Sequence, residues 1–500
     1  MKACLLLQRR FAYIGHYIAL ALKEKYGLTD FCGYVLMRSS YDFLIEQKDI
    51  QYSTLLLDEN IHKKYKKEKI DLKYLSYLEK EFGIPNLWPY IMIDRVIMSN
   101  IPIREYPYNN SKYTHEEMLK IVQIHAKSII EMLNKEKPDF LFCSVVGNVG
   151  SLLLYNIAKK MGIKTFFLTP SCTDGRQIII ENYYSFTFAD KKLDQWKKTK
   201  NTENIEKAKK FLTNFREKPK TYHTKINPIF LNTNLKQKLL LTKKIYKSIS
   251  WYIKILIKYP KQIKFKDYTY DMNPCYYVVD RIKRKIRNII ITEKIYDSFN
   301  ENEDFAFYPL HLEPEISILL HAPFFINQIE TIKHIARSLP IHYKLYVKEH
   351  PLMVGHRAKN FYKEIKKIPN VKLIDHKIDS FSIIKKSKLI TTITGTAGWE
   401  AILLKKPVIT FGEVFYNKLS TVKRCSEIEK LPYMIKDQLE NFKHNEEELL
   451  IFLNAILEDS VPVDLIKLWE DEWDLDKKRK GVEPLADLLA KKLNLEQIKK

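Results

Sequence analysis

The sequence predicts an α/β protein with two Rossmann-like lobes, each built around a parallel sheet. Three observations support this fold class. Short apolar runs alternate with helical patterns in residues 1–200, the alternation returns in residues 301–460, and a strongly basic stretch at 201–300 lies between them. We therefore expect a first lobe at 1–200, a basic helical segment at 201–300, a second lobe at 301–460 and a helical tail at 461–500.

The first lobe is expected to begin with a buried strand and to continue as βα units. The apolar runs that predict strands lie at 3–7, 31–37, 52–57, 140–146 and 163–168, and helical patterns lie at 14–25, 116–134 and 151–161. From Phe140 to Leu168 a strand, a glycine-containing loop, a helix and a strand follow one another. This is the order of a βαβ unit, which builds parallel sheets.

The second lobe repeats this pattern. Strands are expected at 342–347, 371–374, 389–392 and 408–411, and helices at 328–339, 357–367, 380–386 and 399–404. The apolar run 316–320 opens just after Pro314, so either a strand or a helix fits it. Because ligands of such sheets bind at the carboxyl ends of the strands, we expect the functional groups there.

The positive charge is concentrated in one part of the chain. Lys and Arg number 84 against 60 Asp and Glu, and residues 201–300 hold 15 of the excess of 24. Residues 235–266 contain ten lysines and no acid. At about 100° per residue, the apolar residues of 241–256 fall on one helical face and lysines on the opposite face.

This pattern predicts contact with an anionic membrane surface through residues 235–287, which include a second basic run at 281–287. A helix packed on its own domain with a solvated lysine face fits the same pattern. Nucleic acid ranks behind the membrane, because the sequence contains no recognised nucleic-acid-binding module.

The cysteines and the hydropathy indicate the compartment. The six cysteines are dispersed and form no CxxC pair, which favours a reducing compartment without disulfides. The first apolar run is too short for a signal peptide, and no run approaches the ~18 apolar residues of a membrane span. We therefore expect a cytoplasmic protein, peripheral on the inner face of the cell membrane.

Two loops of the second lobe carry groups suited to a polar ligand. The loop 308–315 holds His311 and Glu315 beside prolines, which restrict the backbone, so a carboxylate there is suited to act as a general base or to hold a sugar hydroxyl. Lys348 and His350 follow an expected strand, where they can contact a phosphate. A solvated polar loop and a surface turn are the structural alternatives.

A third loop is the most specific of the three. Thr394, Gly395 and Thr396 lie in a small-residue turn between an expected strand and an expected helix. Hydroxyls and unpaired backbone N–H groups at a helix N-terminus bind anions. Glu400, in the first helical turn, is placed to accept hydrogen bonds from ribose hydroxyls or from backbone N–H groups, and a capping loop that binds no ligand is the structural alternative. The turn is neither a Walker A sequence nor a GxGxxG fingerprint, so neither ATP nor NAD is predicted.

The first lobe offers candidates for the binding of an acceptor. Arg10, His16, Asn148 and Arg176 each lie after an expected strand. Asp174 lies in the same loop as Arg176. We expect Glu315 to be the general base or to position the sugar, with Asp174 as the second candidate. A structural loop role is the alternative for each first-lobe residue.

Residues 307–416 resemble the bacterial capsule polysaccharide biosynthesis proteins, which include Kdo transferases of the GT-B type. The motifs that carry the resemblance are Leu310-His311 with Pro314-Glu315, residues 346–351 (YVKEHP), residues 369–371 (PNV), residues 394–401 (TGTAGWEA), and Lys406-Pro407-Val408 with Phe411-Gly412. A His-Pro motif followed by a Ser/Thr-rich loop is also similar to the site with which GT-B sialyltransferases hold CMP-sugars.

The resemblance implies a GT-B fold, with two lobes facing a cleft and the donor held by the second lobe. By it, His350 and residues 394–396 hold the nucleotide phosphate, and Glu400 holds the ribose. It implies a nucleotide-sugar donor such as a CMP-activated acidic sugar, a glycan or lipid-linked acceptor, and no metal or cofactor. A sugar-nucleotide epimerase on the same fold and a non-catalytic partner in polysaccharide assembly or export remain as alternatives.

Overall fold

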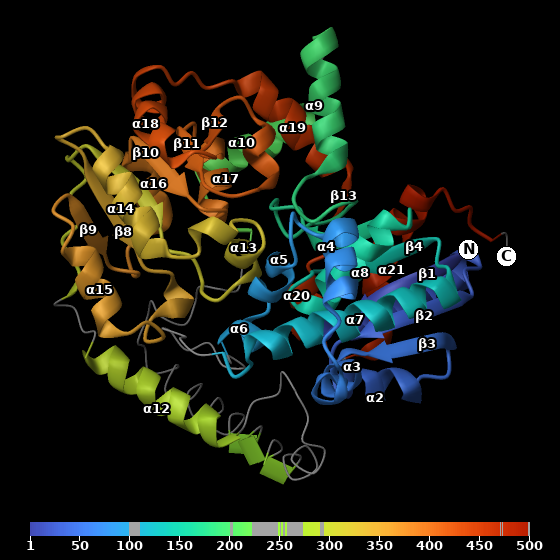
Figure 1. Cartoon of the computed structure of the whole chain (residues 1–500). Coiled ribbons are helices and arrows are strands. Elements are labelled where there is room, and N and C mark those ends of the chain that lie inside the picture. Colours follow the sequence, from blue (N-terminus) through green and yellow to red (C-terminus); the bar gives the residue numbers. More distant parts are fainter. Residues whose placement is uncertain are drawn as a thin grey trace.

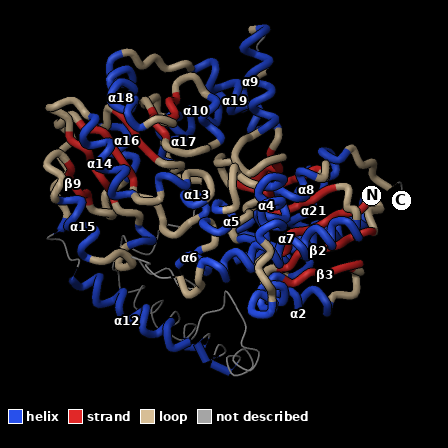
Figure 2. The backbone as a smooth tube through the Cα atoms, in the orientation of Figure 1, coloured by secondary structure: helices blue, strands red, loops and turns tan. Residues whose placement is uncertain are grey.

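The computed structural model describes residues 1–99, 111–200, 204–222, 249–250, 252–253, 256–257, 274–290, 295–470, 472 and 474–498. Figures 1 and 2 show two α/β lobes side by side, each with strands enclosed by helices. This architecture confirms the predicted α/β class with two lobes, each built around a largely parallel sheet. Most of the predicted basic helix at 241–256 lies outside the described residues. Of its apolar face, Ile249, Tyr252 and Leu256 are described; Ile249 and Leu256 are exposed and Tyr252 is half-buried.

The sheet of the first lobe has seven strands in the order β13-β6-β5-β4-β1-β2-β3. The strands are β1 (Lys2–Leu7), β2 (Asp30–Val35), β3 (Tyr52–Leu57), β4 (Phe140–Cys143), β5 (Lys164–Pro170), β6 (Gln177–Ile180) and β13 (Ser460–Val461). β1 to β5 run parallel, whereas β6 is antiparallel to both of its neighbours. Side chains of β1 are buried on both faces of the sheet, which explains its unbroken apolar sequence.

Helices cover both faces of this sheet. They are α1 (Arg10–Tyr26), α2 (Arg38–Glu46), α3 (Asp58–His62), α4 (Leu72–Phe82), α5 (Trp88–Met92), α6 (Arg95–Ser99), α7 (His115–Glu136), α8 (Val149–Lys160) and α21 (Leu475–Leu493), with the 3₁₀ turn η1 (Lys63–Lys67). Apolar side chains of α1 and α21 share one core with one face of the sheet, and those of α7 and α8 share a core with the other.

The sheet of the second lobe has six parallel strands in the order β12-β11-β10-β7-β8-β9. They are β7 (Phe305–Pro309), β8 (Lys344–Lys348), β9 (Val371–Ile374), β10 (Leu389–Thr392), β11 (Val408–Thr410) and β12 (Val422–Arg424). The central strand β7 includes two residues that we had placed in a loop, and the ambiguous run 316–320 forms a short helix, α13 (Ile316–Leu319).

The remaining helices surround the second sheet or join the lobes. They are α9 (Thr187–Thr199), α10 (Glu206–Glu217), α12 (Pro274–Ile290), α14 (Gln328–Ser338), α15 (Lys359–Lys366), α16 (Ser380–Lys386), α17 (Thr396–Leu403), α18 (Leu431–Glu440), α19 (Glu446–Glu458) and α20 (Leu465–Glu470), with the 3₁₀ turns η3 (Pro323–Phe325), η4 (Pro351–Met353), η5 (Phe415–Lys418) and η6 (Ile428–Lys430). No helix of the described residues is both long enough and apolar enough to cross a membrane.

The chain crosses between the lobes twice. α9 and α10 follow the first sheet in sequence but pack against α19, and β13 and α21 then return to the first sheet and to α1. We propose that α9 and α10 form a bridge to the second lobe and that residues 460–493 are part of the first lobe, which would place the limits of the lobes elsewhere than the predicted ranges 1–200, 301–460 and 461–500.

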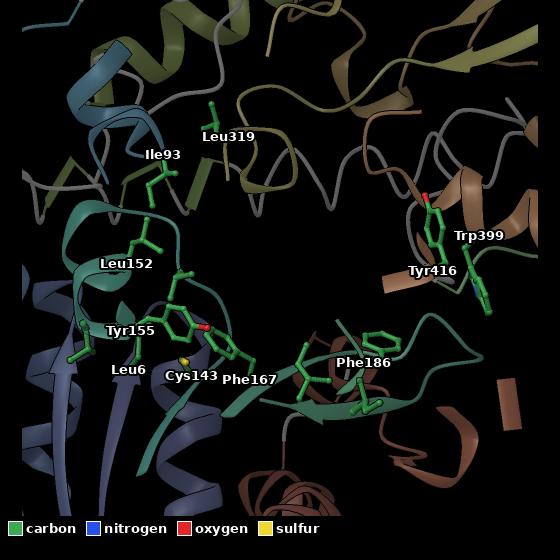
Figure 3. Packing of buried hydrophobic residues seen from close by; sticks show 14 of the residues in the cluster. Leu6, Ile93, Cys143, Leu152, Tyr155, Phe167, Phe186, Leu319, Trp399 and Tyr416 are labelled. Atoms are coloured by element: carbon green, nitrogen blue, oxygen red, sulfur yellow. The ribbon is translucent and has the colours of Figure 1, made fainter. Parts of the chain in front are cut away.

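One apolar cluster extends across the junction of the lobes (Figure 3). Phe186 stacks on Phe415 with ring centroids 4.2 Å apart. The indole N–H of Trp399 in α17 donates to the backbone oxygen of Cys172 at 3.1 Å. These contacts fix α17, which begins at the predicted anion-binding turn, against the first lobe.

Candidate functional site

A cavity of about 680 Å³ lies between the two lobes. Its walls include the loops that follow β1, β4 and β5, so it lies at the carboxyl ends of the first-lobe strands. The second lobe contributes Pro314, Glu315, Ile316 and Leu319. A parallel sheet of this type places its ligand at this edge.

The cavity wall is rich in arginine. Arg9, Arg10, Arg95 and Arg176 line it, against the two carboxylates of Glu315 and Asp464. Arg9 is exposed and directly precedes α1, with φ of 46° and ψ of −128°, a conformation that favours glycine. The excess of cations suits a ligand that carries negative charge.

The structure brings three of the four predicted acceptor residues, Arg10, Asn148 and Arg176, to this cavity. The prediction for His16 is wrong. Its side chain is fully buried within α1, and Nδ1 lies 3.0 Å from the hydroxyl of Tyr52. Tyr52 is the first residue of β3, at the opposite end of the sheet from the cavity. Burial accordingly lowers the pKa of His16.

Arg176 and Asn148 also make hydrogen bonds that stabilise the fold. The Arg176 guanidinium donates from Nε to Ser460 Oγ at 2.8 Å and from Nη2 to the backbone oxygen of Ser460 at 2.5 Å, which ties β6 to β13. Asn148 caps α8 by accepting from the backbone N–H of Ser151 at 2.9 Å. Because these polar groups are engaged, Arg176 and Asn148 shape the cavity more than they offer hydrogen bonds to a ligand.

A buried acidic layer lies behind Asn148. Asp58 accepts hydrogen bonds from the Tyr34 hydroxyl at 2.5 Å and from Asn148 Nδ2 at 3.1 Å. Asp94 accepts from the backbone N–H of Val149 at 3.3 Å, in the first turn of α8. Burial raises the pKa of Asp58 to about 7 and that of Asp94 to about 6. The N-terminus of α8 therefore already has carboxyl partners within the protein.

The two catalytic candidates face different spaces. Glu315 is half-buried, lies on the wall of the 680 Å³ cavity and accepts from the Ser317 hydroxyl at 3.1 Å. Asp174 is exposed, pairs with Lys220 at 3.1 Å and lines a neighbouring cavity of about 130 Å³, together with Glu400. Tyr222 lines both cavities.

The predicted anion-binding turn is partly closed by contacts within the protein. The backbone N–H of Thr394 donates to His311 Nε2 at 3.2 Å, and that of Gly395 donates to Thr392 Oγ1 at 3.1 Å. The Thr394 hydroxyl donates to the backbone oxygen of Ser317 at 2.8 Å. Thr394 and Gly395 therefore shape the turn, and their N–H groups are unavailable to a phosphate.

The first turn of α17 keeps donors for a ligand. The Thr396 side chain is exposed. Within the part of the chain that the structure describes, the backbone N–H groups of Thr396 and Ala397 have no hydrogen-bond partner. The positive end of the helix dipole lies at the same point. Of the predicted anion site at 394–396, only Thr396 keeps an unpaired backbone N–H group among the described residues, and Ala397 adds a second one.

His311 holds the turn from the opposite side. It is 7% exposed, and burial lowers its pKa to about 3, so the ring is neutral. Since Nε2 accepts the Thr394 N–H, the ring proton lies on Nδ1, which has no partner among the described residues. The nearby charge of His350 also lowers the pKa of His311, so the two loops are electrostatically coupled.

Lys348 and Glu400 form a second buried pair of polar groups. Lys348 is 5% exposed and donates to the Ser380 hydroxyl at 2.6 Å, and Glu400 is 6% exposed. Burial raises the pKa of Glu400 to about 8 and lowers that of Lys348 to about 8, and each charge opposes the other group's shift. A carboxyl and an amine with such pKa values are poised to exchange protons with a ligand.

Arg357, which was not among the predicted site residues, fixes the loops of His311 and His350. Arg357 is fully buried, and its Nε donates to Glu349 at 2.8 Å while Nη2 donates to the backbone oxygen of His311 at 2.6 Å. Nη1 pairs with Glu313. Glu349 and Glu313 flank the predicted ligands His350 and Glu315 in the chain, so Arg357 positions both loops.

His350 is half-buried at the end of β8. Its Nδ1 accepts from the backbone N–H of Leu352 at 3.2 Å, so in the neutral ring the proton lies on Nε2. Within the described ranges, no three His, Cys, Asp or Glu side chains are grouped closely enough to bind a metal ion.

Comparisons with known proteins point to one family. Residues 221–421 match the family model described as capsule polysaccharide biosynthesis protein. Protein FixF of Sinorhizobium fredii is 29% identical over 134 residues, which cover 25% of this chain and 31% of FixF. The match therefore spans about a third of that relative.

The similarity to solved structures is low. KpsC, a β-Kdo 2,7 transferase of Thermosulfurimonas dismutans, is 13% identical over 73% of this chain and 89% of that chain, with a TM-score of 0.35. The UDP-GlcNAc 2-epimerase of Neisseria meningitidis bound to UDP-GlcNAc is 14% identical over 99% and 100%, with a TM-score of 0.28. The fold assignment therefore rests on the two sheets themselves. The match to the capsule polysaccharide biosynthesis model covers residues 221–421, less than half of the chain, and it includes all the motifs that carried the resemblance.

Proposed function

We propose that this protein is a GT-B-type glycosyltransferase of bacterial surface polysaccharide synthesis. It would transfer a sugar from a nucleotide donor, such as a CMP-activated acidic sugar, to a glycan or lipid-linked acceptor. The observation that carries the proposal is the arginine-rich cavity between the lobes, which has Glu315 on its second-lobe wall. The family match over residues 221–421 supports the same conclusion.

The donor nucleotide would bind to the second lobe. Its phosphate would accept hydrogen bonds from the N–H groups of Thr396 and Ala397 and from the Thr396 hydroxyl, at the positive end of α17. His350 would donate from Nε2, and Glu400 beside Lys348 would accept from the ribose hydroxyls. As the sugar–phosphate bond breaks, these donors would offset the negative charge that develops on the leaving phosphate.

The acceptor would enter through the first lobe. Its hydroxyl would attack the anomeric carbon, while a carboxylate takes the hydroxyl proton. Glu315 is our first candidate for this base because it lies on the cavity wall, and Asp174 is the second. Arg9 and Arg10 suit an acceptor that carries acidic groups. No cofactor or metal is part of the proposal.

We also propose a cytoplasmic location on the inner face of the cell membrane, with residues 235–287 in contact with anionic lipid. The support is the net charge of this part of the chain, which holds ten lysines and no acid in residues 235–266.

A transfer assay tests the proposal. The full chain is incubated with CMP-, UDP-, GDP- and dTDP-sugars, with and without a capsular oligosaccharide, and products are identified by mass spectrometry. We expect donor consumption that requires the acceptor, and a loss of at least about 100-fold in Glu315→Gln. Glu364→Gln, at an exposed position on α15, is the control that should keep full activity.

The other outcomes would contradict the proposal in different ways. A new epimer of the donor formed without acceptor would identify a sugar-nucleotide epimerase. The absence of both binding and turnover of every nucleotide would identify a non-catalytic partner in assembly or export.

A further inference from the structure

The outward face of α12 is apolar. Val278, Val279, Ile282 and Ile286 are 37%, 46%, 52% and 50% exposed. At about 100° per residue they fall within an arc of about 100°. Single apolar side chains scattered over a surface are common, but large apolar side chains gathered on one exposed face mark an interaction surface. The four residues of this stripe are gathered in this way.

The opposite face of α12 is held by the second lobe. Asp280 is 3% exposed and pairs with Arg284. Arg284 Nη1 lies 3.2 Å from His356 Nε2, and Arg287 Nη1 donates to the backbone oxygen of His356 at 2.9 Å. Asp280, Arg284 and Arg287 fall within an arc of about 60°, opposite the apolar stripe. The docked face of α12 is therefore the polar one, which reverses the usual arrangement of a surface helix.

Cations lie on both sides of the apolar stripe. Arg281 and Lys283 are exposed, and on the helical wheel they fall about 60° before and about 40° after it. Helices that lie flat in a membrane interface combine an apolar stripe with flanking Lys and Arg. Figure 1 shows α12 at the edge of the molecule, apart from both sheets.

We propose that the outward face of α12 lies in the interface of an anionic lipid bilayer, with Val278, Ile282 and Ile286 inserted and Arg281 and Lys283 at the headgroups. The inference rests on the membrane contact proposed above and narrows it to one helix face. Charge complementarity favours a lipid surface over a protein partner, because the stripe has cations on both sides and the one described acid of the helix, Asp280, is turned inward.

This arrangement would attach the second lobe to the bilayer through α12. His356, which α12 holds, directly precedes Arg357, and Arg357 fixes the loops of Glu313 and Glu349. Binding of α12 to a membrane would therefore hold the second lobe in a defined orientation toward the lipid surface.

Flotation of the full chain with vesicles tests the inference. Vesicles of phosphatidylcholine alone are compared with vesicles of phosphatidylglycerol and phosphatidylcholine in equal amounts, at low salt. The wild-type protein should float with the anionic vesicles only. The double variant Ile282→Ser/Ile286→Ser should bind at least about tenfold more weakly. Arg281→Gln/Lys283→Gln should lose roughly fivefold per cation.

A matched control is the double variant Ile341→Ser/Tyr433→Ser, which removes two apolar side chains of the same lobe that are 102% and 76% exposed. It should bind vesicles like the wild type, and circular dichroism should show all variants folded. Wild-type binding that the α12 variants retain would overturn this inference alone. No wild-type binding would overturn the whole membrane contact.

Two further outcomes separate the inference from the proposed activity. Transfer to a water-soluble acceptor does not involve the membrane, so its failure would contradict only the proposed function. A wild-type dimer that becomes monomeric in Ile282→Ser/Ile286→Ser, measured by light scattering, would show that a second copy covers the face and would contradict the lipid assignment.

Discussion

Replacing Arg357 by methionine should destabilise the second lobe severely. The substitution keeps an apolar stem but removes the guanidinium, which is fully buried and contacts Glu349, Glu313 and the His311 backbone oxygen. The side chains of Glu349 and Glu313 are at most 2% exposed, so both carboxylates would lose their counter-charge without gaining water. Removal of one partner from a buried ion pair costs about 3–5 kcal/mol.

The loss of unfolding free energy in Arg357→Met should depend on pH. Burial already raises the pKa of Glu313, and removal of Arg357 would raise it further. An acid whose pKa is raised in the folded state binds a proton more tightly there, so stability falls as the pH rises above the unfolded value. The variant should therefore lose more stability at about pH 8 than at about pH 5.

The assay is urea denaturation followed by circular dichroism at both pH values. The control is Arg424→Met, which removes an arginine of the same lobe that pairs with Glu413 at 43% and 45% exposure. An exposed pair contributes about 0–1 kcal/mol. If Arg357→Met cost no more than Arg424→Met, or if its cost did not grow with pH, the assigned role of the buried arginine would be wrong.

Three further predictions concern the site. Glu400→Gln should gain stability relative to the wild type as the pH rises from about 4.5 to about 8, because the raised pKa of Glu400, about 8, makes its contribution to the wild-type free energy of unfolding fall over this range; in urea titrations, a difference that did not grow with pH would contradict the burial effect assigned to Glu400. Arg9→Gly should raise the melting temperature, because it relieves a positive φ of 46° that costs about 1–3 kcal/mol. The same variant should raise the KM for an anionic acceptor, because it removes a cation from the cavity wall, and an unchanged KM would exclude Arg9 from the acceptor site. Gly398→Ala should lower the free energy of unfolding by about 1–3 kcal/mol and weaken nucleotide binding. A Cβ at this position would lie 2.3 Å from the Tyr416 hydroxyl, which donates to the Gly395 backbone oxygen, so the turn would have to move. Unchanged binding in calorimetry would show that the turn tolerates this movement.

The alternation of apolar runs and helical patterns predicted most elements of both sheets, because buried parallel strands and their crossover helices leave local signals. The strand at 371–374 and the helix at 380–386 match the structure to the residue. β7 was recognised only as a loop from Tyr308 onward, since its five residues end in a proline and its neighbours β8 and β10 come later in the sequence. The two-residue strand β13 and the packing of α21 on α1 depend on contacts across most of the chain, which no local pattern records.

The candidate site was predictable in part. The loops that follow strands did bring Arg10, Asn148 and Glu315 to one cavity. His16 failed because helical phase turns it into the core beside Tyr52. The arginine behind the donor loops was missed because its role depends on burial. The carboxylates of Glu313 and Glu349, each in a loop that follows a buried strand, were the signal that a buried cation was needed.

Calorimetric titration of the full chain with CMP, UDP, GDP and dTDP tests the central claim most directly, since the claim is that the first turn of α17 and His350 hold a nucleotide phosphate. We predict that one nucleotide binds to the wild type, and that His350→Ala and Thr396→Val each weaken its binding at least about tenfold while the melting temperature stays unchanged. Binding of equal affinity in the wild type and both variants, or no binding of any nucleotide, would contradict the account.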